Sequence, residues 1–192
     1  MTEIRFPDAE TIDEITAHYL LSMPTSLMPM LYGFRCAEDG IDAECATVDL
    51  TGDRHDDEPN PLHLRAAHLR SLLGPDMFGF GFVFVVFADQ LDDRDENRHI
   101  PAQVRSAAAR LPGVDDVIVA VVIDATGRQW WAVVGRHLIE LDPVRIHIPA
   151  TAPESWRIPE TLDASLWAAA LALDEANHPH LLRLRSSPQA NT

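Results

Sequence analysis

The sequence predicts an α/β protein: a single three-layer-like domain in which helices cover a mixed β-sheet. Two apolar runs carry this prediction, at about residues 80–88 and 117–124. Both runs are rich in β-branched or aromatic side chains and lack alternation of apolar and polar residues. Each is therefore expected to form a central strand that is buried on both faces. The length of 192 residues is enough for one full core.

Four segments with a helical repeat of apolar residues predict the helices. The first covers about residues 8–21 and begins at Asp8, a residue type that caps helix N-termini. The other three are expected at about residues 61–73, 101–111 and 160–176.

A first β-hairpin is predicted from residues 26–36 and 44–50, because the Asp39-Gly40 pair between them favours a tight turn. Pro29 lies within the first arm and lacks a backbone N–H group. We therefore expect this arm to be an edge strand or to bulge at Pro29.

The same turn sets a register for the two cysteines of the chain. With Asp39-Gly40 at its centre, Cys36 pairs with Ala43 and Cys45 pairs with Phe34. The two thiols then lie on one face as diagonal neighbours. They form either a reduced, buried pair or a redox pair.

A second hairpin is predicted from residues 117–124 and 129–135, joined by a short loop. Adjacent residues of a strand point to opposite faces, so Trp130 and Trp131 are expected on different sides of the sheet. Trp131 is then either an interaction anchor or packed under another element. Trp156 is a second candidate anchor, in the proline-rich segment 149–159.

Short β segments are expected at residues 138–141 and 144–148. In the second of these, Arg145 and His147 face away from the apolar side. The predicted domain spans residues 1–185, and residues 186–192 are expected to be a disordered tail.

Charge limits the partners of this chain. Thirty acidic and 15 basic residues give a formal net charge of −15, and every basic residue is an arginine. A phosphate backbone would be repelled unless the arginines clustered, and they are scattered along the sequence, which argues against nucleic acid. No apolar run reaches the roughly 20 residues of a membrane span. With two cysteines and no visible secretion signal, we expect a cytoplasmic protein.

The motifs Gly-x-Ser-x-Gly, Gly-x-x-x-x-Gly-Lys and His-Glu-x-x-His are absent from the sequence, and the lack of lysine excludes Schiff-base chemistry and a P-loop lysine. The remaining candidate site is a set of carboxylates at strand ends. We expect the acidic ends of the two central strands to emerge at one rim of the sheet, where α/β sheets tend to hold ligands. The candidate catalytic residues are Asp89, Asp93 and Asp124, with His99.

Of these, Asp89 and Asp93 are also the candidate ligands of a Mg²⁺ ion, and no other cofactor is predicted. The acidic loops at residues 53–58 and 89–96 are either cation-binding or simply solvated connections.

Four short motifs resemble an actinobacterial domain family known as DUF4192. They are Pro24-Thr25-Ser26-Leu27, Ala46-Thr47-Val48-Asp49-Leu50, the strand from Val83 to Asp89, and Gly127-Arg128-Gln129-Trp130-Trp131. The likeness covers about residues 12–131, and Pro29 and the acidic residues 53–58 depart from it. The resemblance implies an actinobacterial cytoplasmic protein, in agreement with the arginine-only basic set. It implies no activity.

Two functions follow from these observations. The first is a non-enzymatic binding or regulatory module that contacts another protein or a second copy of itself. The alternative is a divalent-metal-dependent enzyme of the hydrolase type that uses the carboxylates at the strand ends.

Overall fold

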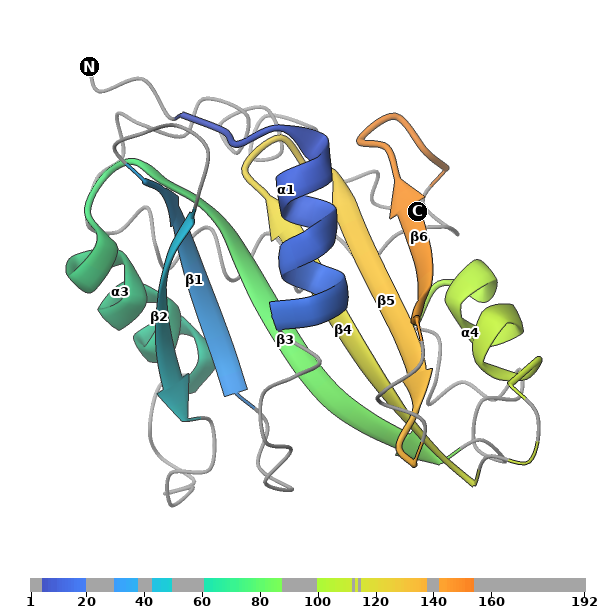
Figure 1. The fold of residues 1–192 in the computed structure, drawn as a ribbon. Helices are drawn as coiled ribbons and strands as arrows, with labels where there is room; N and C mark the ends of the chain where they lie inside the picture. The colour runs from blue at the N-terminus through green and yellow to red at the C-terminus, as the bar shows by residue number, and fades with distance from the viewer. Residues whose placement is uncertain are drawn as a thin grey trace, which may run out of the picture.

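The computed structural model describes residues 5–19, 30–37, 43–49, 61–87, 100–111, 113, 115–137 and 142–153. A helix begins the described chain, with α1 (Ala9–Glu14) continuing directly as the π-helix η1 (Ile15–Tyr19). The elements that follow are shown in Figure 1; in chain order they are β1 (Met30–Cys36), β2 (Ala43–Asp49), α3 (Pro61–Leu73), β3 (Met77–Phe87), α4 (Ala102–Ala108), β4 (Asp116–Asp124), β5 (Gln129–Gly135) and β6 (Val144–Ile148).

The six described strands form one sheet in the order β2-β1-β3-β4-β5-β6. All five neighbouring pairs are antiparallel, so the described sheet is not the mixed sheet that the sequence predicts. The physical reason is that an apolar run indicates only that both faces of a strand are buried. Helices can bury both faces of an antiparallel sheet as well as those of a mixed or parallel sheet. The pattern of apolar residues therefore does not indicate the direction of the strands.

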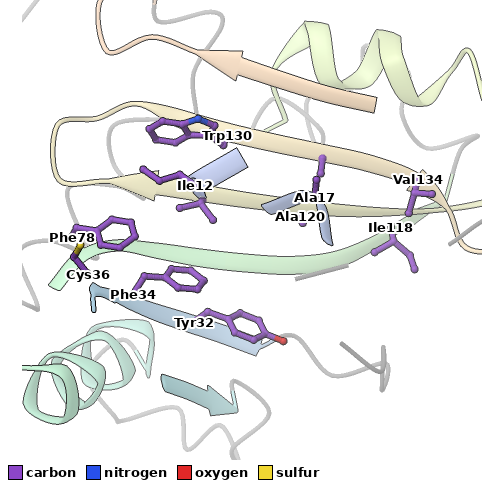
Figure 2. Close-up of a cluster of buried hydrophobic side chains, with 12 residues drawn as sticks. Ile12, Ala17, Tyr32, Phe34, Cys36, Phe78, Ile118, Ala120, Trp130 and Val134 are labelled. Atoms are coloured by element: carbon purple, nitrogen blue, oxygen red, sulfur yellow. The ribbon is translucent and has the colours of Figure 1, made fainter. Parts of the chain in front are cut away.

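One face of the sheet is covered by α1 and η1 (Figure 1). Ile12 and Ala17 from this helix pack into a buried cluster with side chains from the four strands β1, β3, β4 and β5. Figure 2 shows this cluster, which includes Tyr32, Phe34, Cys36, Phe78, Ile118, Ala120, Trp130 and Val134. Asp8 caps α1 as predicted, and its Oδ1 atom accepts a hydrogen bond of 2.7 Å from the N–H of Thr11.

The opposite face carries α4, whose Val104 and Ala108 belong to a second buried cluster with Val119 and Trp131. Helix α3 lies on this same side, against β1 and β2. A Cβ atom on Gly33, which follows Tyr32 in β1 and so points away from the α1 face, would meet Leu73 of α3. Helices therefore contact both faces of the described sheet, which explains why the central strands have no polar face.

The first predicted hairpin is confirmed in its register: Phe34 pairs with Cys45, and Cys36 pairs with Ala43. The expectation of an edge strand is wrong, because β1 lies between β2 and β3. Its partner β2 is the outer strand on that side of the described sheet. Pro29 itself lies outside the described residues, so a bulge there stays a prediction.

The second hairpin, β4–β5, and the strand β6 also lie where the sequence predicts them. Three of the four predicted helices are present at residues 9–19, 61–73 and 102–108. The predicted fourth helix at 160–176, the segment 138–141 and the tail at 186–192 lie outside the described residues. None of the helices in the described part of the chain is both long and apolar enough to cross a membrane.

Candidate functional site

Asp124 is the predicted catalytic residue whose position the structure describes. It ends β4, and its side chain is 0% exposed. Its Oδ1 atom accepts hydrogen bonds from the N–H of Thr126 (2.9 Å), the hydroxyl of Thr126 (2.6 Å) and the N–H of Arg128 (3.0 Å). Its Oδ2 atom accepts from Nε of Arg128 and pairs with Nη2 of the same guanidinium, each at 2.7 Å. Both oxygens of Asp124 are therefore engaged in closing the β4–β5 turn.

The described register also corrects the expected rim. Asp124 pairs with Gly79 at the start of β3, whereas Phe87 at the end of β3 pairs with Asp116. The C-terminal ends of β3 and β4 thus lie at opposite ends of the sheet, about 26 Å apart at ~3.3 Å per residue. The two acidic strand ends do not share a rim, because antiparallel neighbours end at opposite edges.

Asp89, Asp93 and His99 lie outside the described residues, as do the acidic loops 53–58 and 89–96. Their role as catalytic or Mg²⁺-binding groups stays a prediction. Within the residues that the structure describes, no group of three or more His, Cys, Asp or Glu side chains could hold a metal ion.

The two adjacent tryptophans lie on opposite faces of the sheet, as predicted. Trp131 is 1% exposed and packs on the α4 side, where its indole Nε1–H donates to Oε1 of Gln129 at 3.1 Å. Trp131 is therefore a core residue and offers no surface to a partner, which corrects its candidacy as an interaction anchor. Trp156 lies outside the described residues.

Trp130 packs on the α1 side and is also 1% exposed. The imidazole of His147 stacks on its indole with a centroid distance of 5.0 Å. The guanidinium of Arg128 lies 5.0 Å from the Trp130 centroid and 5.8 Å from that of Phe6. A polar side chain from β6 and another from the β4–β5 turn thus contact this buried indole.

A second polar cluster joins the first helix to β6, and Arg145 is its centre. The Nη1 atom of Arg145 donates to Glu14 at 2.7 Å and to Asp13 at 2.8 Å. Its Nη2 atom lies 2.8 Å from Nε2 of His18 and 3.5 Å from Oδ1 of Asp142. We call these five residues the Arg145 cluster.

The hydrogen bond from Arg145 lowers the pKa of Glu14, and the bonds to Glu14 and Asp13 raise the pKa of Arg145. Glu14 is consequently negative and Arg145 positive at neutral pH. The sequence places Arg145 and His147 on the polar side of β6, but no local pattern indicates partners that lie more than 120 residues earlier in the chain.

Most described arginines contact other groups of the protein through their guanidinium groups. Arg128, Arg136 and Arg145 each pair with carboxylates. Two more donate to backbone carbonyls near the end of α3: Arg35 to Leu73 at 3.1 Å, and Arg70 to Gly74. Among the described arginines, only Arg5 and Arg110 are exposed.

The predicted cysteine geometry is confirmed. Cys36 and Cys45 form no disulfide and both belong to the face covered by α1, Cys36 buried and Cys45 half-buried. Diagonal neighbours across an antiparallel pair are separated by about 7–8 Å, whereas a disulfide needs Cα atoms within about 7 Å. The register therefore favours the reduced pair over the redox pair.

Comparison with known proteins adds no relative: no protein-family model, curated protein or solved structure matches this chain.

Proposed function

We propose that this protein is a non-enzymatic binding module whose partner is a positively charged protein. The observation that carries the proposal is the way charge is distributed between the interior and the surface. The chain has a formal net charge of −15, and its described arginines are largely engaged within the fold. Because carboxylates are almost never buried without a partner, we infer that the acidic excess faces solvent.

The exposed acids that the structure describes support this distribution. Glu10, Asp115 and Asp142 are exposed, and Glu14 is exposed although it also contacts Arg145. A field of one sign attracts a partner of the opposite sign and accelerates its association, and added salt screens this attraction. The two cysteines, which form no disulfide, further support a reducing compartment such as the cytoplasm.

The chemistry of Asp124 also favours binding over catalysis. A catalytic carboxylate has to reach a substrate or a metal ion, and it needs free oxygen lone pairs to do so. Both oxygens of Asp124 are buried and already accept hydrogen bonds within the β4–β5 turn. A hydrolase mechanism would have to do without this residue.

The test is co-purification of the full chain from its native host, followed by identification of the retained protein and measurement of its association rate. We expect a basic protein whose retention falls as salt rises from about 0.05 to about 0.5 M, because the Debye length shortens to a few ångströms. The variant Glu10→Lys/Asp115→Lys should slow association, and the uncharged control Ser106→Ala/Thr151→Ala should not.

Two results would overturn the proposal. A retained partner with a net negative charge, or binding that is insensitive to salt, would exclude charge complementarity. Stabilisation of the chain against heating by Mg²⁺, Mn²⁺ or Zn²⁺ would instead favour the metal-dependent enzyme, because a ligand stabilises the state that binds it.

A further inference from the structure

The imidazole of His18 makes two contacts through the same nitrogen atom. Its Nε2 atom lies 2.8 Å from Nη2 of Arg145 and 3.2 Å from Oε2 of Glu14. His18 belongs to η1 and Arg145 belongs to β6, so the first contact joins two elements. Glu14 lies four residues before His18, so the second contact stays within the first helix.

These contacts require opposite states of the nitrogen. A guanidinium only donates hydrogen bonds, so the contact with Arg145 needs a lone pair on Nε2. A carboxylate only accepts them, so the contact with Glu14 needs a proton on Nε2. Glu14 stays ionised while a histidine titrates, because its hydrogen bond from Arg145 lowers its pKa. One nitrogen cannot serve both partners at once.

We propose that His18 is a proton-controlled contact between η1 and β6. Neutral His18, with its proton on Nδ1, accepts a hydrogen bond from Arg145 and ties η1 to β6. Protonated His18 donates to Glu14 instead and repels the Arg145 guanidinium, so this tie is released.

The charged groups around His18 decide how much of the attachment remains after protonation. Asp13 and Glu14 from α1 still hold Nη1 of Arg145, and Asp142 lies near its Nη2 atom. On β6, the titratable His147 stacks on Trp130. On the same face, β4 carries two acids by the alternation of strand side chains: Asp124 at the turn pairs with Arg128, and Asp116 at the start of the strand pairs with Arg136.

The consequence is a first helix whose second half loosens on acidification. η1 contacts β4 and β5, and its Ala17 packs in the cluster that contains Trp130. Histidine is the side chain that proteins most often use as a pH switch.

The experiment is nuclear magnetic resonance on the full chain with ¹⁵N-labelled histidine. At about pH 8 we expect the ring shifts of His18 to report an unprotonated Nε2 atom. As the pH falls to about 5, hydrogen-exchange protection of the η1 amides should fall about two- to fivefold, the size expected for one surface contact, after correction for intrinsic exchange.

Two variants isolate the contact. In His18→Gln the side chain does not titrate, so the corrected protection of η1 should be the same at both pH values. In Arg145→Met the partner is missing, so protonation of His18 should no longer lower that protection. A proton on Nε2 at about pH 8 in the wild type would overturn the proposal. So would a pH response in the wild type that matches that of His18→Gln.

Discussion

Trp130 and His147 lie directly opposite each other on β5 and β6, with ring centroids 5.0 Å apart and ring planes inclined by 27°. The indole is almost fully buried, whereas the histidine is an exposed residue. The imidazole of His147 in β6 thus covers part of the Trp130 indole.

Replacing His147 by alanine should lower the free energy of unfolding by about 1 kcal/mol, because aromatic pairs contribute about 0.5–1.5 kcal/mol beyond their buried area. The matched control is His137→Ala, since His137 is also exposed and lies two residues after the end of β5. Urea denaturation measures both variants. Equal effects of the two substitutions would show that the stack adds nothing to stability.

Replacing Asp124 by alanine should lower the free energy of unfolding by about 2 kcal/mol. The substitution removes the carboxylate that holds two backbone N–H groups and the Arg128 guanidinium. Breaking a fully buried ion pair costs about 3–5 kcal/mol, and the partial exposure of Arg128 reduces this figure. Asp115→Ala is the control, because Asp115 is exposed. A loss below about 0.5 kcal/mol for Asp124→Ala would contradict the structural role given to the turn.

The local parts of the fold could be predicted from the sequence because each depends on neighbouring residues. A turn centred on Asp39-Gly40 predicted the register that β1 and β2 have, and the two-residue period of strands predicted Trp130 and Trp131 on opposite faces. Strand order and direction could not be predicted in this way. The central strands are apolar on both faces in antiparallel and parallel sheets alike, provided that helices cover both sides.

The prediction of the candidate site depended on strand order and direction. Asp124 follows an apolar run in the sequence and so resembled a catalytic strand end, but the antiparallel register places it away from the end of β3. Arg145 and its partners in α1 and η1 meet only through tertiary packing. No spacing within the sequence indicates such a contact.

Acidification should destabilise the protein through Asp8 and Glu14. The hydrogen bond from the Thr11 N–H lowers the pKa of Asp8, and the hydrogen bond from Arg145 lowers the pKa of Glu14. A carboxyl group with a lowered folded-state pKa stabilises the fold fully above its unfolded-state pKa, which is 3.8 for Asp8 and 4.5 for Glu14. That contribution is lost as the pH falls through the folded-state pKa.

The urea midpoint of the wild type should therefore fall between about pH 6 and pH 3. Glu14→Gln should lower the midpoint at the higher pH and reduce its further fall on acidification, because the variant has already lost one of the two contributing carboxylates. Glu10→Gln is the control, because Glu10 is exposed and only its backbone N–H, which the substitution keeps, lowers the pKa of Asp8. A midpoint that rises on acidification would reverse the expected sign.

The two thiols should differ in reactivity without forming a bond to each other. Cys45 is half-buried and Cys36 is buried, so iodoacetamide should modify Cys45 first. Incubation with oxidised glutathione should give no intramolecular disulfide, because the diagonal register separates the residues too far. Mass spectrometry distinguishes these products. A mass loss of two hydrogens in the monomer would show that the strands move enough to close the bond.

Alanine substitutions at two strand glycines should differ in cost because their neighbours differ in freedom to move. A Cβ atom on Gly79 would lie 2.9 Å from the backbone oxygen of Ile123, on the adjoining strand. A Cβ atom on Gly33 would lie 2.8 Å from Cδ1 of Leu73, the far end of a flexible side chain. Backbone of a central strand cannot yield without disturbing its ladder, whereas a leucine can change rotamer.

Gly79→Ala should therefore lower the free energy of unfolding by about 2–3 kcal/mol, within the range for overpacked cores, and Gly33→Ala should cost about 1 kcal/mol. Both glycines are buried, so the pair controls for position in the sheet. Urea denaturation of the two variants gives the comparison. If Gly33→Ala proved the more costly, the contact between α3 and β1 would have to be more rigid than the β3–β4 ladder.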